Sequence, residues 1–468
     1  MENILHWIWI SLWDWCCTFC TPVMLLSCGL VLSFGIGIHR ILHPVRFVRT
    51  LLDIPENSRT SPFKAVTMAL AGTLGVGNIT GVSAAILQGG IGAVFWMWIG
   101  ALVSMAVKYG EVALAVKYRR THSDGTHFGG MMYVIRDGLR KKGFTGIAWG
   151  CGGIFALLCI GNALVTGTIV QSHAAASVLL PVPEWGTGIL LAVLTILAIL
   201  YGSGKIGDIT LRLVPGMTLV FMVLSLWIIL GNVNLLPSIL RDITAEAFSI
   251  RAVGGGITGL GIRGILKSGI AQSVRYGISR GIFSNEAGCG TSPTAHASAD
   301  TRSPFQQGCY GILEVFCDTI VLCTMTALVL CIGDRRYGIF SAGGENLTLR
   351  AYQVFGGNVV YWLMAGMVTV FAYATILAQT YYGITAIGYF TEKKTVRILY
   401  LALTVGCVWL GAVIESEKMW ILADRVICLM TCCNTAVLFL LRREIYDTVP
   451  KEMRNNHAQR NTGDKTQA

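Results

Sequence analysis

Two glycine-rich stretches inside long apolar segments carry the residue types suited to binding a small charged solute. They are residues 71–82 and residues 281–293, and the second adds Ser284, Asn285 and Glu286 to its glycines. Glycine accepts backbone angles that other residues avoid, so both stretches are predicted to interrupt a helix. Irregular backbone in apolar surroundings is tolerated only where it is buried in protein or lines a wet cavity. Both stretches are therefore candidate binding sites.

An interrupted helix binds charge at its freed ends. Gly75, Gly77 and Gly81 allow the first stretch to unwind, which frees N–H groups at the start of one half-helix and carbonyls at the end of the other. The N–H groups attract a carboxylate, and the carbonyls can ligate a hard cation or an ammonium group, so a zwitterionic amino acid matches the pair. The alternative is that the glycines serve only close helix packing. A dinucleotide loop is excluded because the spacing to Gly81 is wrong and no βαβ unit surrounds it.

The elements that position these stretches are predicted to be transmembrane helices. The chain has 468 residues, of which 54% are hydrophobic and 13% charged, whereas a soluble protein carries roughly 25% charged residues. Apolar runs recur from residues 24–38 to residues 419–441. With the two broken segments they make about eleven spans of roughly 20 residues each. The predicted fold class is an all-α integral membrane protein, because a soluble protein would need charged outer faces that the sequence lacks.

The two stretches divide the chain into comparable halves, since each opens a block of about five spans. Interrupted segments at corresponding positions of two halves indicate an inverted-repeat transporter whose site lies near the bilayer midplane. The predicted division begins with an N-terminal transmembrane helix and a cytoplasmic loop (residues 1–58), followed by a first repeat (59–232). An external connection (233–264), a second repeat (265–441) and a cytoplasmic tail (442–468) complete it.

Charge predicts the orientation of the chain. Basic residues cluster in alternate connections, for example at 117–120, 136–142 and 393–397. By the positive-inside rule these connections are cytoplasmic, which places the N-terminus outside and the C-terminus inside. The formal charge of +11 is thus spread over loops, and no nucleic-acid partner is predicted. The first span lacks a basic n-region and is predicted to be uncleaved; the tryptophans ahead of it, predicted to form an aromatic belt, are Trp7, Trp9, Trp13 and Trp15.

Ionisable residues within the apolar segments need a partner or a function. Lys108 and Glu111, at i,i+3 spacing, are predicted to neutralise each other. Asp318 lies in an otherwise apolar run, with Glu314 one turn earlier. Arg275 and Arg280 flank the second stretch and are expected to hold the unwound segment or a gate through ion pairs.

No residue set for enzymatic chemistry is visible. His296 stands alone beyond the second stretch, and Cys17 and Cys20 form a CxxC pair without a second pair or a nearby histidine, so a metal site there is not expected. We predict a protein that is not an enzyme. Its partners are predicted to be the lipid bilayer and a small solute, with no obligate protein partner.

Short stretches along nearly the whole chain resemble the alanine/glycine:cation symporter family of bacteria and archaea. The stretches that carry the resemblance are Gly75-Val-Gly-Asn-Ile-Thr-Gly-Val82, Phe95-Trp-Met-Trp98, Gly129-Gly-Met-Met-Tyr133, Arg280-Gly-Ile-Phe-Ser-Asn-Glu-Ala-Gly288, Gln307-Gly308, Asp318-Thr319 and Tyr381-Tyr-Gly383. The resemblance implies a LeuT-type fold of five plus five helices in inverted repeats, preceded by one extra helix. It also implies uptake of alanine or glycine with sodium (Na+) across the plasma membrane of a prokaryote.

The resemblance also implies site residues. The substrate carboxylate would meet backbone N–H groups around Gly75–Asn78, and the implied substrate-site residues are Thr73, Gly75, Val76, Gly77, Asn78, Gln171, Phe283, Ser284 and Gln379. The implied sodium site lies between carbonyls near Ala71 and Leu74, with Phe371 and the hydroxyl of Thr375. Oxygen donors of this kind suit a hard cation.

The chain departs from the family at several of these positions. Ala374 stands where the family usually has Thr, which removes one possible sodium ligand and keeps a proton (H+) open as the coupling ion. Gln379 stands where the family usually has Trp, so the preferred substrate is expected to be larger or more polar than alanine, with serine, threonine and glutamine as candidates. Alternatively, Gln379 bonds a neighbouring helix. Cys289 and Thr291 replace the common Met and Ser. A channel is a further alternative to a transporter.

Overall fold

The computed structural model describes residues 20–53, 61–179, 182–200, 203–249, 269–301, 303–344, 346–414 and 416–453. These residues are almost entirely helical, which confirms the all-α prediction, and they include one short hairpin of β1 (Arg120–Thr121) and β2 (His127–Phe128). The predicted aromatic belt at Trp7–Trp15, much of the predicted external connection and most of the predicted tail lie outside the described residues.

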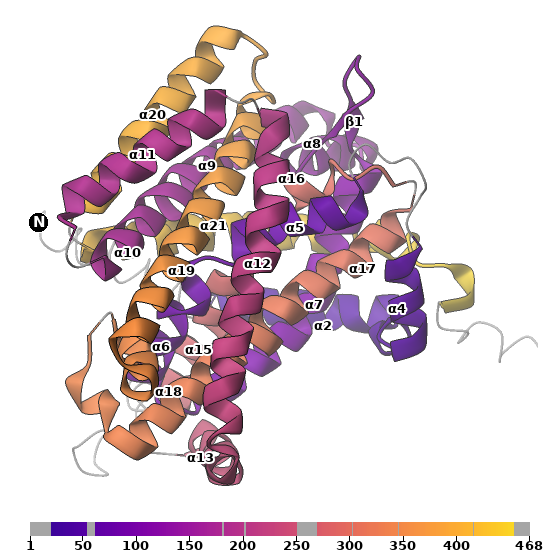
Figure 1. The fold of residues 1–468 in the computed structure, drawn as a ribbon. Coiled ribbons are helices and arrows are strands. Elements are labelled where there is room, and N and C mark those ends of the chain that lie inside the picture. Colours follow the sequence, from indigo (N-terminus) through magenta and orange to yellow (C-terminus); the bar gives the residue numbers. More distant parts are fainter. Residues whose placement is uncertain are drawn as a thin grey trace, which may run out of the picture.

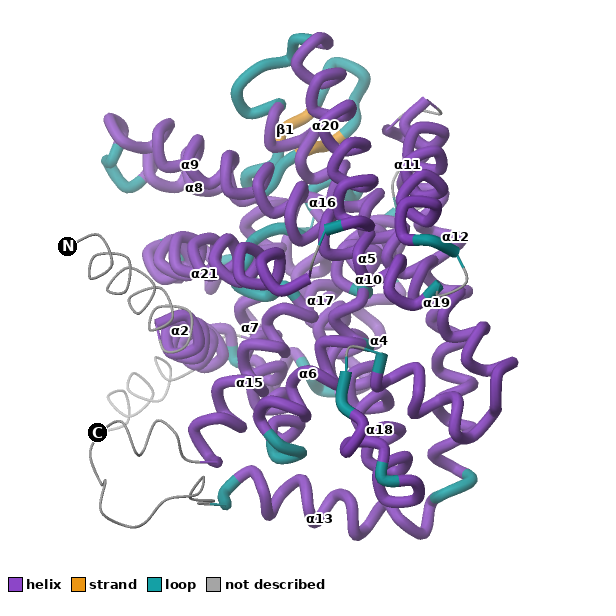
Figure 2. The backbone as a smooth tube through the Cα atoms, turned by 90° about the vertical axis from the view of Figure 1, so that its left-hand side faces the viewer, coloured by secondary structure: helices purple, strands orange, loops and turns teal. Residues whose placement is uncertain are grey.

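The long helices lie side by side and at steep angles to one another in a single body (Figures 1 and 2). They are α2 (Thr21–Ile36), α5 (Pro62–Thr73), α6 (Thr80–Gly89), α7 (Ala93–Lys117), α9 (Thr145–Leu164), α10 (Val170–Val178), α11 (Glu184–Leu200), α12 (Ser203–Leu230), α15 (Gly269–Asn285), α17 (Pro304–Val315), α18 (Thr324–Tyr337), α19 (Leu347–Ile387), α20 (Lys394–Val413) and α21 (Ser416–Leu440). Further helices connect or extend them: α3 (Ile38–Ile41), α4 (Pro44–Leu52), α8 (Met131–Lys141), α13 (Leu236–Ala247), α16 (Pro293–His296) and α22 (Arg442–Tyr446). The hairpin and α13 lie at opposite ends of the body in both views.

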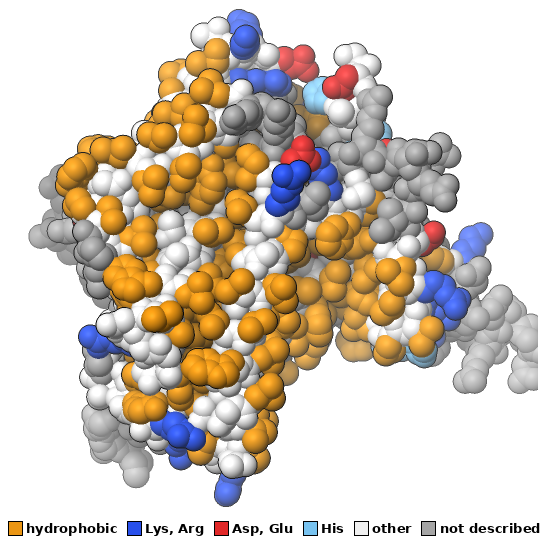
Figure 3. Space-filling view, viewed as in Figure 1, with side chains coloured by type: hydrophobic (Ala, Val, Ile, Leu, Met, Phe, Trp, Pro, Cys, Tyr) orange, Lys and Arg blue, Asp and Glu red, His pale blue; other side chains and the backbone are white. Residues whose placement is uncertain are grey.

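Seven helices among the described residues are long and apolar enough to cross a membrane. They are Ala93–Lys117, Thr145–Val178, Asp208–Leu230, Pro304–Tyr337, Leu347–Ile387, Lys394–Val413 and Met419–Leu440. Two shorter apolar helices, α2 and α11, accompany them. Hydrophobic side chains cover most of the face in Figure 3, with much of the charge toward its margins, as expected of a surface that contacts lipid.

Helix ends follow ordinary capping chemistry. The hydroxyl of Ser61 accepts a hydrogen bond from the backbone N–H of Lys64 at 3.1 Å, and Pro62 occupies the first turn of α5. Ser303 accepts from the N–H of Gln306 in the same way at the start of α17. A side-chain acceptor and an early proline are both favourable at a helix N-terminus. These caps fix where the segments on either side of the interruptions begin.

The first glycine-rich stretch interrupts a helix as predicted. The backbone leaves the α-helical conformation at Leu74, is extended at Gly75, and forms the 3-10 turn η2 (Val76–Asn78) before α6 begins at Thr80. The region is buried. Its N–H and carbonyl groups are therefore released from the helix inside the protein.

The second stretch is also interrupted, within the predicted residues 281–293. Helix α15 continues to Asn285, and the backbone turns at Glu286, whose φ is 49°. The turn is stabilised because the side-chain oxygen of Asn285 accepts from the N–H of Ala287 at 2.9 Å. Gly288 and Gly290 follow with φ of 89° and 74°, angles that favour glycine.

Two π-helical turns lie inside long helices, η3 (Val165–Ile169) between α9 and α10 and η5 (Phe316–Cys323) between α17 and α18. Such turns occur frequently at functional sites. Both contact the candidate site: Gly167 of η3 packs directly on Gln379, and η5 carries Asp318.

Candidate functional site

Asp318 connects the two interrupted segments. Its carboxylate accepts a hydrogen bond from the side chain of Asn78 at 2.7 Å and another from the hydroxyl of Ser284 at 2.9 Å. Thr319 donates to the same carboxylate at 2.7 Å, and Asn285 donates to Thr319 at 3.0 Å. All five side chains are buried. The segments also touch directly, because a methyl group built on Gly77 would lie 3.2 Å from Cα of Ser284.

Gln171 and Thr375 lie against the unwound backbone of the first segment. The side-chain oxygen of Gln171 accepts from the N–H of Val76 at 3.3 Å. A methyl group on Gly75 would lie 2.8 Å from that oxygen and 2.9 Å from the hydroxyl of Thr375. Glycine is therefore required at position 75, because the side chains of Gln171 and Thr375 approach its backbone too closely for a methyl group to fit. The structure thus brings together Gly75, Val76 and Gln171 as the resemblance implies, and places Thr375 beside them.

Three of the residues implied for the sodium site lie together. The hydroxyl of Thr375 donates to the carbonyl of Ala71 at 2.9 Å and to that of Phe371 at 3.1 Å. Leu74 lies at the end of α5, three residues beyond Ala71. Hydroxyl and carbonyl oxygens are the donors that a hard cation such as sodium prefers. The residues present therefore fit such an ion.

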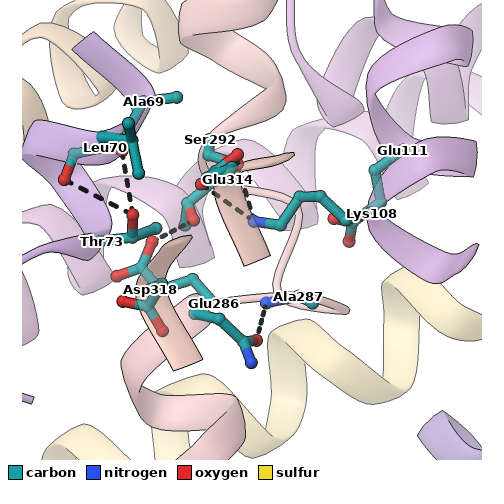
Figure 4. A network of polar contacts seen from close by, with 12 residues as sticks. Ala69, Leu70, Thr73, Lys108, Glu111, Glu286, Ala287, Ser292, Glu314 and Asp318 are labelled. Atoms are coloured by element: carbon teal, nitrogen blue, oxygen red, sulfur yellow. Dashed lines mark hydrogen bonds and ion pairs between the residues drawn. The ribbon is translucent and has the colours of Figure 1, made fainter. Parts of the chain in front are cut away.

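Thr73 and Phe283 differ from the other implied residues. The hydroxyl of Thr73 donates to the carbonyls of Ala69 and Leu70 within its own helix, at 3.3 and 3.5 Å (Figure 4). Phe283 instead lines a cavity on one side of the interruptions. Neither residue is joined by a side-chain hydrogen bond to the cluster around Asp318 in the described residues.

Gln379 bonds Glu286 rather than standing free. Its amide nitrogen donates to the two carboxyl oxygens of Glu286 at 3.0 and 3.3 Å, and its oxygen accepts from Asn162 at 3.4 Å. Thr291, one of the positions at which the chain departs from the family, also donates to Glu286. Gln379 is fully buried, with its Cβ against Gly167. A contact between Gln379 and substrate stays a prediction.

Lys108 pairs with Glu314, which corrects the predicted pair with Glu111. The ammonium group lies 3.3 Å from Glu314 and 2.8 Å from the hydroxyl of Ser292 (Figure 4). Glu111 instead accepts from Asn434. Spacing along α7 predicted a local pair, but Glu314 reaches Lys108 from α17, a contact that spacing along one helix cannot indicate.

His296 has hydrogen-bond partners, although in the sequence it stands alone beyond the second stretch. Its ring nitrogens lie 3.0 Å from Glu314 and 2.8 Å from Gln307. It extends the Lys108 pair, so that α7, α16 and α17 share one buried polar network. The network contains no group of three or more His, Cys, Asp or Glu arranged to hold a metal ion among the described residues.

The sequence prediction missed Asp318 and Asn162 as parts of the site. Asp318 had a usable signal, because an acidic residue in an apolar run is usually paired or functional. Asn162 had none, since a single buried amide does not indicate its partner.

A cavity of about 610 Å³ opens on one side of the interruptions. Phe283 forms part of its wall and packs against Trp420, with ring centroids 5.1 Å apart. Arg280 lies over both rings and forms an ion pair with Asp424 at 3.4 Å. The expected ion pair of Arg280 is thus present, and it links α15 to α21 beside the second interruption.

The match to known proteins covers the chain from end to end. The model of the sodium:alanine symporter family matches residues 1–467. The chain belongs to this family. It is therefore a transporter rather than an enzyme, and a multi-pass membrane protein.

Relatives in the sodium:alanine symporter family carry different substrate and ion names. The sodium/alanine symporter AgcS of Methanococcus maripaludis is 33% identical over 451 residues, covering 93% of this chain and 95% of the relative. A probable sodium/glutamine symporter of Bacillus subtilis is 30% identical, covering 93% and 88%. A candidate sodium/proton-dependent alanine carrier of the same organism is 30% identical, covering 90% and 88%. Membership thus indicates amino-acid transport, with sodium coupling general in the family.

Proposed function

We propose that this protein is a secondary active symporter that imports a small neutral amino acid together with sodium by alternating access. The observation that carries the proposal is the meeting of two interrupted helices at Asp318, beside released backbone that contacts Gln171 and Thr375. Released N–H groups suit a carboxylate and released carbonyls suit a cation. A zwitterionic amino acid bound together with a hard cation would use both the released N–H groups and the released carbonyls.

The substrate class is a neutral amino acid of the alanine and glycine type, extended to larger or more polar ones. The proposed contacts are the implied substrate-site residues, from Thr73 to Gln379. If Gln379 also faces the substrate, Gln379→Trp should shift the ranking of serine, threonine and glutamine downward relative to alanine and glycine.

Sodium is the proposed coupling ion, held by oxygens of Ala71, Leu74, Phe371 and Thr375. The convergence of Thr375 with two carbonyls supports it. Among the described residues of this region, four buried carboxyl groups accompany one buried lysine, so a bound cation would reduce the cost of burying negative charge. The four are Glu111, Glu286, Glu314 and Asp318. A proton would meet the same need and is the second candidate.

The proposed topology has eleven spans in a LeuT-type arrangement. The seven long helices, α2, α11 and the two interrupted segments together make that number. We place the repeats at residues 59–232 and 265–441, the N-terminus outside and the C-terminus in the cytoplasm of a prokaryote. The cavity next to Phe283 then opens to the outside.

Uptake of a panel of labelled amino acids into proteoliposomes tests the function. Alanine, glycine, serine, threonine and glutamine are compared with leucine, lysine and glutamate, each with and without an inward sodium gradient. The proposal expects saturable, sodium-stimulated uptake of small neutral members and exchange of preloaded substrate. Flux that neither saturates nor exchanges would favour a channel. Absence of uptake for every neutral amino acid would refute the assignment.

A further inference from the structure

The cavity beside Phe283 has an excess of positive charge. Among the described residues that line it are three arginines, Arg275, Arg280 and Arg425, and one acidic residue, Asp424. Its remaining polar lining is neutral or histidine. A cleft lined by charges of one sign focuses the field and raises the local concentration of ligands with the opposite charge. The cavity therefore favours anionic groups.

Arg280 and Arg275 have different surroundings on the same helix. Arg280 is paired with Asp424 and covered by two aromatic rings. Arg275 contacts the ring of Tyr276 at 5.1 Å, and within the described part of the chain it has no carboxylate partner. Arg275 is half-buried and lines the cavity, and a guanidinium carries five N–H donors that a ligand there could use.

The backbone that carries Arg275 is firmly held. The hydroxyl of Ser273 donates to the carbonyl of Gly89 at 2.6 Å, and a methyl group on Gly277 would lie 2.3 Å from the carbonyl oxygen of Ala93. The outer part of α15 thus packs tightly on α6 and α7. Arg275, Tyr276 and Ser279 all line the cavity from this fixed segment, so the guanidinium is positioned without further folding.

We propose that Arg275 forms an outer subsite that binds the carboxylate of the incoming substrate before it passes Phe283. Guanidinium binds carboxylates through two parallel N–H donors, and does so better than an ammonium group. Eight residues of α15 separate Arg275 from Phe283, about 12 Å along the helix axis. The subsite is therefore separate from the released backbone at the interruptions. This inference rests on the proposed transport of amino acids.

The experiment measures initial rates of sodium-driven alanine uptake in proteoliposomes. Arg275→Gln removes the charge and should raise KM by about three- to tenfold, the range expected for the net contribution of a typical hydrogen bond, with little change in the maximal rate. Arg275→Lys should give an intermediate KM. Arg350→Gln is the matched control, because Arg350 is exposed on α19 and does not line the cavity; its KM should equal that of the unmodified protein.

Ionic strength gives a second measurement that needs no variant. With sodium fixed and choline chloride raised from low to about 0.15 M, screening should increase KM of the unmodified protein. The increase should be smaller in Arg275→Gln. An unchanged KM in a folded Arg275→Gln protein, or a KM of the unmodified protein that ignores ionic strength, overturns the subsite while leaving the transport function intact. Failure of the unmodified protein to take up any amino acid overturns the function itself.

Discussion

The side-chain amide of Gln379 donates to both carboxyl oxygens of Glu286, and thereby ties α19 to the turn of the second interruption. Gln379→Leu would leave this buried carboxyl with Thr291 as its remaining side-chain donor among the described residues. Loss of hydrogen bonds to a buried charged group costs about 1–3 kcal/mol. We therefore expect a lower midpoint in thermal unfolding of the purified protein.

The control for Gln379 is its neighbour Thr380. Thr380 is equally buried, but its hydroxyl bonds only the carbonyl of Ile376 in its own helix, at 2.6 Å, in the described residues. Thr380→Val should leave the midpoint nearly unchanged. Equal midpoints for Gln379→Leu and the unmodified protein would mean that the bond to Glu286 contributes nothing to stability.

Asp318 is expected to be essential for transport because it holds Asn78 and Ser284 together. Asp318→Asn keeps the size of the side chain but replaces one acceptor oxygen with an N–H₂ group, which cannot accept from both segments. We expect uptake to fall about tenfold or more, corresponding to at least 1.4 kcal/mol. Ser284→Ala removes one of the two bonds and should have a smaller effect.

Asp334 provides the comparison for Asp318. It lies at the end of α18 and accepts from the N–H of Phe340 at 2.9 Å, away from the interruptions. Asp334→Asn should retain most of the uptake. If Asp318→Asn were as active as Asp334→Asn, the proposed role of Asp318 in joining the two segments would be wrong.

Thr375 is predicted to contribute the side-chain oxygen of the sodium site, since Ala374 has none to offer. Thr375→Ala should abolish the stimulation of uptake by sodium, whereas Thr375→Ser should retain much of it. Thr369→Ala is a suitable control, because Thr369 bonds the carbonyl of Ala365 in the same helix and is not part of the proposed site. Sodium stimulation that survives in Thr375→Ala would place the ion elsewhere.

Glu444, beyond the last long helix, should make stability depend on pH. Burial alone would raise the pKa of this carboxyl, but hydrogen bonds from Tyr118, Lys117 and Lys141 lower it from its ordinary 4.5 to about 2. Because the pKa of Glu444 is lower in the folded state than in the unfolded state, its contribution to stability is complete above pH 4.5. That contribution is lost as the pH falls toward 2.

The test compares Glu444→Gln with the unmodified protein in thermal unfolding between pH 7 and pH 3. The difference in midpoint should be largest at neutral pH and should shrink as the pH falls below about 4.5. Glu392→Gln, at an exposed carboxyl of the loop before α20, serves as the control and should show little difference at any pH. A difference that is constant with pH would assign the effect to packing rather than charge.

Much of the arrangement was accessible from the sequence because it depends on local composition. Glycines at 75 and 77 predicted an interruption that the structure contains, and the apolar runs predicted the helical fold. The second interruption also falls within the predicted stretch, but its exact position at Glu286 could not be predicted, because it depends on the hydrogen bond that Asn285 accepts from the N–H of Ala287. Helix propensity, which depends on residue type, does not indicate that hydrogen bond.

The partners of the buried polar and charged side chains could not be predicted from the sequence. Lys108 was assigned to Glu111 by spacing along one helix, whereas its partner Glu314 lies 206 positions away in the chain. Gln379 likewise finds Glu286 at a separation of 93 positions. Contacts of this kind depend on how the helices pack against one another. A single sequence shows which residues share a face of one helix, but it does not show which residues of another helix they contact.

The central claim is that sodium drives the uptake of a small neutral amino acid, and concentrative uptake into proteoliposomes tests it most directly. Labelled alanine and serine are followed under an inward sodium gradient, with membrane potential and pH clamped. The account predicts accumulation above the external concentration, which collapses when the sodium gradient is dissipated. Accumulation that is indifferent to sodium and instead follows an imposed pH gradient would contradict it.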